Sequence, residues 1–74
     1  MKIKIISFHK IFYQKNVISI IAPGSRGYFQ ILENHAPFIS ILKNGFLKFE
    51  SKNVKKEKIE GILQVKKNIV IVIL

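Results

Sequence analysis

The chain has 74 residues and a formal net charge of +9, with 13 Lys and Arg against four Glu and no Asp. This length allows one domain with a thin core, because a chain of this size buries only about 60% of the surface that it exposes when unfolded. The absence of Cys excludes a disulfide framework and a thiolate metal site. A hydrophobic content of 49% favours a folded protein over a disordered one.

β-branched residues dominate the chain, and no long 3.6-residue periodicity appears, so the sequence predicts an all-β domain. In the N-terminal half, the second expected strand ends at Pro23-Gly24, because Pro lacks an amide donor and Gly can adopt a positive φ. The third is expected to place Phe29 and Ile31 on the same face. These three strands are expected over residues 2–5, 16–22 and 27–32.

The C-terminal half is expected to contain three tight turns. Asn44-Gly45 is the favoured pair for a type I′ hairpin, Ser51-Lys52-Asn53 is a charged tip, and Lys66-Lys67-Asn68 closes a last hairpin. Turns about every 6 to 12 residues suit a small sandwich or flattened barrel, because closure hides strand edges. The strands joined by these turns are expected over residues 38–42, 47–50, 54–59, 61–65 and 69–74.

The terminal run from Ile69 to Leu74 carries apolar side chains on both strand faces. Such a strand needs cover on both faces, and a chain this short has little left to supply the second cover. A protein partner is therefore expected on that side, with self-association as the alternative.

Few residues of the chain could support catalysis. Glu33 and His35 are two positions apart across a turn, so their side chains could meet as an acid–base pair. The alternative is that His35 hydrogen-bonds the backbone and holds the turn before Ala36-Pro37. Ser40 has no base beside it, and no residues stand at metal-ligand spacing. The sequence therefore predicts no catalytic residue, no metal and no cofactor.

The segment Gly24-Ser25-Arg26-Gly27 is rich in glycine, as phosphate-binding loops are. It lacks the Gly-Lys-Ser/Thr ending and opens a strand rather than a helix, so no helix N-terminus would face an anion. An exposed loop between rigid strands is better suited to binding a protein.

Lysines gather toward the C-terminal end, where either a solvated face or an RNA-binding patch would account for them. No aromatic residue for base stacking follows Phe49, and the chain has a single Arg. A small basic RNA-binding β-barrel is therefore the alternative function, while the leading interpretation expects no nucleic acid. The lysines concerned are Lys52, Lys55, Lys56, Lys58, Lys66 and Lys67.

Four linked motifs follow one another along the chain. They are Pro23-Gly24-Ser25-x-Gly27, Phe29-x-Ile31-Leu32, His35-Ala36-Pro37 and Leu42-Lys43-x-Gly45. In this order they resemble the N-terminal domain of the epsilon subunit of the F-type ATP synthase, and the resemblance covers residues 1–74. It implies a single β-sandwich domain of about 8–10 short strands, without an active site or cofactor.

In that family the domain lies at the foot of the central stalk, between the gamma subunit and the ring of membrane-embedded c subunits. The resemblance implies a peripheral place on the cytoplasmic face of the bacterial inner membrane, with membrane contact only through the complex. By the same analogy, the c ring would contact Ser25, Arg26, Gly27, Tyr28 and His35. Gamma would contact the last hairpin, including Ile69, Ile71 and Ile73. The structural turns would use Pro23, Gly24, Ala36, Pro37, Gly45 and Gly61.

Three departures from the family pattern stand out. Arg26 and Tyr28 occupy a loop that is often acidic in the family, so a compensating change is expected on the c ring. Glu60-Gly61 stands where Gly-Gly is usual, and Tyr13-Gln14 where Ser-Gly is usual. No part of the sequence matches the family's C-terminal helical hairpin, so the chain is expected neither to restrain ATP hydrolysis nor to bind ATP.

Overall fold

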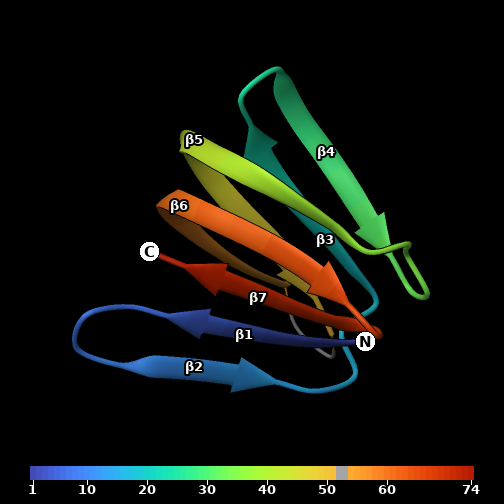
Figure 1. Ribbon diagram of the computed structural model, residues 1–74. Helices are drawn as coiled ribbons and strands as arrows, with labels where there is room; N and C mark the ends of the chain where they lie inside the picture. The colour runs from blue at the N-terminus through green and yellow to red at the C-terminus, as the bar shows by residue number, and fades with distance from the viewer. Residues whose placement is uncertain (52–53) are drawn as a thin grey trace.

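The computed structural model describes residues 1–51 and 54–74, and the side chains of all residues except 52–57. Every regular element in this part of the chain is a strand, which confirms the all-β prediction (Figure 1). No helix that could cross a membrane occurs among the described residues. The strands are β1 (Lys2–Ile6), β2 (Ile11–Gln14), β3 (Ser19–Gly24), β4 (Gly27–Leu32), β5 (Phe38–Glu50), β6 (Val54–Lys66) and β7 (Ile69–Ile73).

The seven strands form one mixed sheet in the order β2-β1-β7-β6-β5-β3-β4. β1 and β7 run parallel, and the other pairs are antiparallel. β5 and β6 have 13 residues each and bend sharply, so the sheet folds over itself into two layers (Figure 1). One layer contains β2, β1, β7 and the second half of β6, and the other contains β3, β4 and the second half of β5.

The bend coincides with a register shift between β5 and β6. Leu42 pairs with Gly61 and Gly45 pairs with Ile59, so two residues of β5 oppose the single Glu60. An extra residue of this kind is a β-bulge, which bends a strand and increases its local twist. A side chain at Gly45 would place its Cβ 2.6 Å from Cβ of Pro23, so Gly allows β3 to approach the bulge.

The hairpin predicted at Asn44-Gly45 is therefore wrong, because Gly45 lies inside a continuous strand. Neither residue has the positive φ that a type I′ turn requires. Gly61 likewise lies within β6 rather than at a turn. Two pairs of expected short strands consequently merge into two long ones, and residues 1–51 and 54–74 contain seven strands rather than about 8–10.

The remaining turns and strand boundaries were predicted with mixed success. The last hairpin is confirmed, with Lys67 and Asn68 both in the left-handed region at φ 49° and 61°. β2 was not predicted, and β3 begins later than expected because Asn16 turns the chain at φ 57°. β5 and β6 pair as expected, and Lys52-Asn53 of the predicted tip lie outside the described residues.

The core fills the space between the two layers. Alternate residues point inward, so Ile3 and Ile5 of β1 are buried and Phe29 and Ile31 of β4 share the inner face as predicted. Phe12 and Phe49 pack across the core with ring centroids 5.5 Å apart. The buried residues are Met1, Ile3, Ile5, Val17, Ile20, Ala22, Ile31, Leu42, Leu47, Phe49, Ile59, Leu63, Val65, Val70 and Val72.

Candidate docking surfaces

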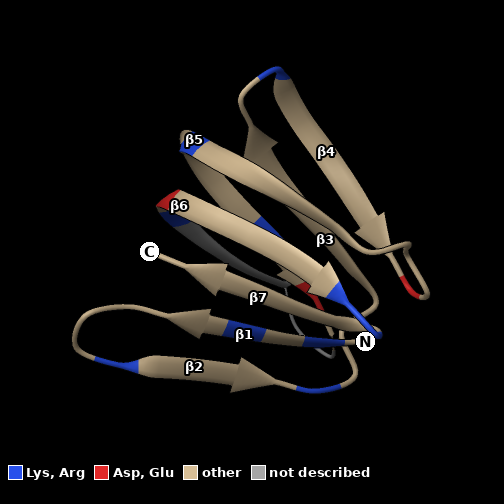
Figure 2. Ribbon diagram, viewed as in Figure 1, with Lys and Arg blue, Asp and Glu red and all other residues tan. Residues whose placement is uncertain are grey.

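The loop of Ser25, Arg26 and Gly27 is the turn between β3 and β4, and all three residues are exposed. Gly27 has φ 119°, a conformation that a side chain disfavours, while a Cβ built there meets no atom within 4 Å. The turn is thus an exposed loop that carries one positive charge, that of Arg26 (Figure 2).

Tyr28 follows this turn and has a structural contact of its own. Its hydroxyl oxygen accepts a hydrogen bond from the Phe46 N–H, with an N–O distance of 3.1 Å. A Cβ on Gly45 would lie 2.9 Å from the same hydroxyl, so the ring covers the bulge of β5. Tyr28 therefore holds the β3–β4 hairpin against the bend, in addition to any contact with a partner.

We expect Tyr28→Phe to lower the free energy of unfolding by about 0.5–1.5 kcal/mol, the usual contribution of one hydrogen bond. Urea denaturation of the variant and the parent protein measures this difference. Gln30→Ala, on the same exposed face of β4, serves as the control and should change stability by less than about 0.5 kcal/mol. Equal stability of Tyr28→Phe and the parent would show that the hydroxyl contributes nothing to the fold.

His35 lies beyond the other end of β4, in the loop of residues 33–37. At about 3.3 Å per residue, β4 spans roughly 17 Å from Gly27 to Leu32, and His35 follows three residues after Leu32. The structure therefore does not bring His35 close to the Ser25–Gly27 turn. Nδ1 of His35 donates a hydrogen bond to the Ala36 carbonyl oxygen at 2.7 Å, and the ring packs against Phe38.

Glu33 has a different partner from the one that catalysis would need. Its Oε1 atom lies 3.2 Å from the ammonium group of Met1, which also donates to the Val17 carbonyl oxygen at 3.1 Å. Glu33 thus connects the loop after β4 to the residue that precedes β1. His35 hydrogen-bonds the backbone of its own turn, which was the alternative to an acid–base pair. No cluster of three potential metal ligands occurs among the residues described.

An uninterrupted row of five isoleucines crosses the outer face of the first layer. Cross-strand pairing places these residues side by side, since Ile6 pairs with both Ile11 and Ile73, and Ile62 pairs with both Ile73 and Ile41. Ile62 is 47% exposed and Ile73 50%, although they sit at the middle of the sheet. We call this set the isoleucine row: Ile11, Ile6, Ile73, Ile62 and Ile41.

The predicted apolar strand Ile69 to Leu74 contributes to this face. Val70 and Val72 are fully buried in the core, while Ile69, Ile71 and Ile73 point to the outer side, as the two-faced pattern predicts. Lys4 pairs with Ile71, so charged and apolar residues alternate beside the row. A shallow hollow of about 480 Å³ adjoins it, lined by Pro37, Phe38, Ile39, Gln64, Val65 and Lys66.

The outer face of the second layer is mixed. Lys48 and Glu50 lie next to each other there, with Nζ and Oε1 3.7 Å apart, and Gln30 is exposed on β4. The exposed side chains of Tyr28, Leu32 and Phe46 share this face. Sequence reasoning found Ile73, the member of the isoleucine row on β7, but missed the other four, because each of them lies in a separate strand with an ordinary alternating pattern.

The predicted lysine cluster is only partly described. The side chains of Lys52, Lys55 and Lys56 lie outside the described residues. Lys58 is in the first half of β6, while Lys66 and Lys67 are at its far end and in the following turn. Because β6 bends between them, Lys58 belongs to a different layer from Lys66.

Comparison with known proteins identifies the family. The domain family described as ATP synthase, Delta/Epsilon chain, beta-sandwich domain matches residues 1–74. The ATP synthase epsilon chain of Leptospira interrogans serogroup Icterohaemorrhagiae serovar copenhageni (strain Fiocruz L1-130) is 40% identical over 70 residues, covering 92% of this chain and 55% of that protein. That of Chlorobium limicola is 40% identical over 62 residues, covering 81% of this chain and 70% of that protein.

The fold has a counterpart among solved structures. A chain in the cryo-EM structure of the Tetrahymena thermophila mitochondrial ATP synthase central stalk and c ring superposes with a TM-score of 0.78 at 18% identity. The match covers 97% of this chain and 60% of that one. This chain spans about half the length of the Leptospira relatives that it matches. On the match over all 74 residues, the chain belongs to the beta-sandwich domain family of the ATP synthase delta and epsilon chains.

Proposed function

We propose that this chain is a non-catalytic rotor subunit of the central stalk of an F-type ATP synthase. It links the gamma subunit to the c ring and couples ion translocation to ATP synthesis. The isoleucine row carries this proposal, because an exposed apolar strip at the centre of a sheet is a surface that a protein partner covers. Membership of the delta and epsilon family supports gamma as that partner.

The gamma contact is centred on the middle of the isoleucine row, where Ile62 and Ile73 are paired neighbours. Ile69 and Ile71 lie beside it on β7 and extend the contact toward Lys2 and Lys4. The paired strands below hold these side chains at fixed spacing, so gamma meets a preformed surface that loses little conformational freedom on binding.

The c-ring contact uses both ends of β4. Ser25, Arg26, Gly27 and Tyr28 are at one end and His35 is at the other, so contact at both ends requires the β4 edge to lie along the ring. β4 is an edge strand of the sheet, which leaves that side accessible. Arg26 favours an acidic group on the facing loop of the ring.

This assignment places the chain peripherally at the cytoplasmic face of the bacterial inner membrane, held there through the complex. It needs no cofactor and no catalytic residue in this domain. A stiff body suits the task, because torque passes through the domain only if its two contact surfaces keep their relative positions.

The alternative function is RNA binding by a small basic β domain, which the net charge of +9 favours. The two functions differ in their salt dependence. Phosphate-driven binding to a single strand loses affinity with a log–log slope of about −0.7 per contacted phosphate. Burial of an apolar strip on gamma is far less sensitive to salt.

The test is a pull-down with purified gamma subunit at low and at high salt. We expect a one-to-one complex that persists at high salt. Absence of a complex at either salt concentration, with RNA recovered at low salt instead, would replace the rotor assignment by the alternative.

A further inference from the structure

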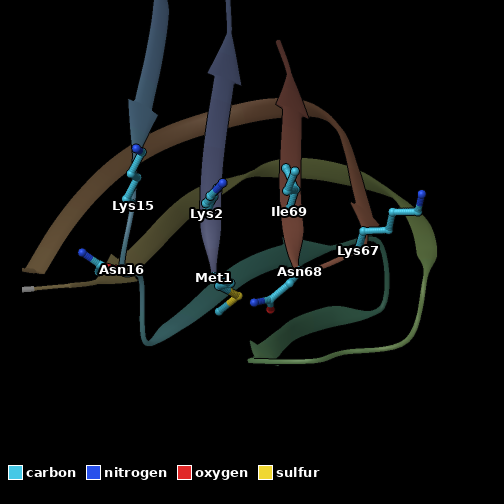
Figure 3. A pocket seen from close by; sticks show the side chains of 7 residues that line it. All are labelled: Met1, Lys2, Lys15, Asn16, Lys67, Asn68 and Ile69. Atoms are coloured by element: carbon cyan, nitrogen blue, oxygen red, sulfur yellow. The ribbon is translucent and has the colours of Figure 1, made fainter.

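A hollow of about 360 Å³ lies where the ends of β1, β2 and β7 meet two turns of the chain (Figure 3). It opens at the ends of the strands, and it shares Lys2 and Ile69 with the margin of the proposed gamma contact. None of the residues that line it is acidic. They are Met1, Lys2, Lys15, Asn16, Lys67, Asn68 and Ile69.

Three lysines line this hollow without a counter-charge. Lys2, Lys15 and Lys67 are exposed, and none forms an ion pair with any residue that the structure describes. The nearby carboxylate of Glu33 is already paired with the ammonium of Met1. Positive charges lining a concave surface focus the potential there and attract anions.

The rim also offers a side-chain amide donor. Oδ1 of Asn68 accepts a hydrogen bond from the Asn34 N–H at 3.1 Å, which leaves the Nδ2 group of Asn68 as a donor. The Asn68 carbonyl oxygen accepts from the Lys2 N–H at 3.1 Å, and the Met1 carbonyl oxygen accepts from the Val17 N–H at 2.8 Å. These bonds hold the two turns, so the rim is built before a ligand arrives.

The arrangement of the lysines indicates the shape of the ligand. Figure 3 shows Lys2 and Lys15 on adjacent strands, with Lys67 on the far side of Ile69. The three ammonium groups do not converge on one point, and the side chain of Lys67 extends away from the other two. Lysine binds phosphate as a mobile point charge, so three such groups can neutralise several phosphate charges at once.

We propose that this hollow binds a phosphate-bearing anion with several negative charges. Two sources have that chemistry, namely a free polyphosphate group and the headgroup of an anionic lipid. Binding at this hollow is tested on the isolated chain without gamma, so its failure is distinguishable from failure of the gamma contact.

The experiment titrates the chain with inorganic tripolyphosphate at constant ionic strength and follows backbone amide shifts by NMR. We expect saturable shifts at residues around the hollow and an increase in the thermal midpoint, because a ligand that binds only the folded state stabilises it. The triple variant Lys2→Gln, Lys15→Gln, Lys67→Gln should bind at least about 10-fold more weakly, which corresponds to a loss of at least about 1.4 kcal/mol for the three lysines together.

The matched control is Lys10→Gln, Lys43→Gln, Lys58→Gln, which removes the same charge at exposed positions away from the hollow. Equal loss in the two triple variants, or no saturable binding, overturns the proposal.

Binding to vesicles of phosphatidylglycerol in phosphatidylcholine identifies the source of the phosphate group. Binding to them that requires the hollow lysines indicates a headgroup, and binding to tripolyphosphate alone indicates a free polyphosphate. Single-stranded RNA is the remaining ligand to compare. If it binds more tightly than tripolyphosphate and both triple variants weaken its binding equally, the binding comes from diffuse positive charge, and the proposal is overturned.

Discussion

Ile62→Glu is expected to weaken the complex with the gamma subunit by at least about 100-fold while the domain remains folded. Ile62 is 47% exposed at the centre of the isoleucine row, with Ile73 and Ile41 as its cross-strand neighbours. A carboxylate in the middle of an apolar interface is desolvated without a partner, which costs several kcal/mol. In the free domain the same carboxylate stays in water, so stability should change by about 1 kcal/mol or less.

Titration calorimetry with purified gamma measures the change in affinity, and thermal unfolding checks the fold. The control is Ile18→Glu, since Ile18 is 60% exposed but lies outside the isoleucine row. Both variants add one negative charge, so a general electrostatic effect would appear in both. If Ile18→Glu weakens the complex as much as Ile62→Glu does, or neither has an effect, gamma does not bind at the row.

Gly61→Ala is expected to lower the free energy of unfolding by roughly 3 kcal/mol, the upper end for overpacking in a well-packed site. A Cβ at position 61 would approach the carbonyl oxygen and carbon of Ile73 and lie 3.1 Å from Cα of Leu74. All three are backbone atoms, so no side chain can rotate away, and β6 and β7 would have to separate. A loss of 1 kcal/mol lowers the thermal midpoint by about 4–8 °C in a domain of this size.

Gly27→Ala is the matched control for this prediction. Its Cβ meets no atom within 4 Å, so the cost comes only from the φ of 119° and should be about 1–2 kcal/mol. Thermal unfolding of the two variants separates steric overlap from backbone strain. A Gly61→Ala protein as stable as Gly27→Ala would show that β7 moves aside at little cost.

Much of the fold follows from local patterns in the sequence. Alternation in residues 2–5 and 27–32 was enough to assign the inner faces of β1 and β4, and the ordered turn motifs indicated the family. The final hairpin at Lys67-Asn68 was also predicted correctly. Such features depend on neighbouring residues, so short-range preferences decide them.

The bend in the sheet was not predictable in the same way. Asn44-Gly45 has the composition of a hairpin turn, yet β5 continues through it because β3 and β6 pair with the strand on both sides. Pairing across the sheet outweighs the local turn preference of two residues. Gly45 is instead used for the close approach of Pro23, a requirement that appears only when the strands are assembled.

By itself, the sequence determined that the chain is an all-β domain of the epsilon type and that its last strand is apolar on both faces. Only the tertiary structure decided which residues meet. Strand register placed Ile11, Ile6, Ile73, Ile62 and Ile41 in one row, and the length of β4 separated His35 from the Ser25–Gly27 turn. The physical reason is that side-chain alternation has a period of two within each strand, whereas register is set between strands that lie far apart in the chain.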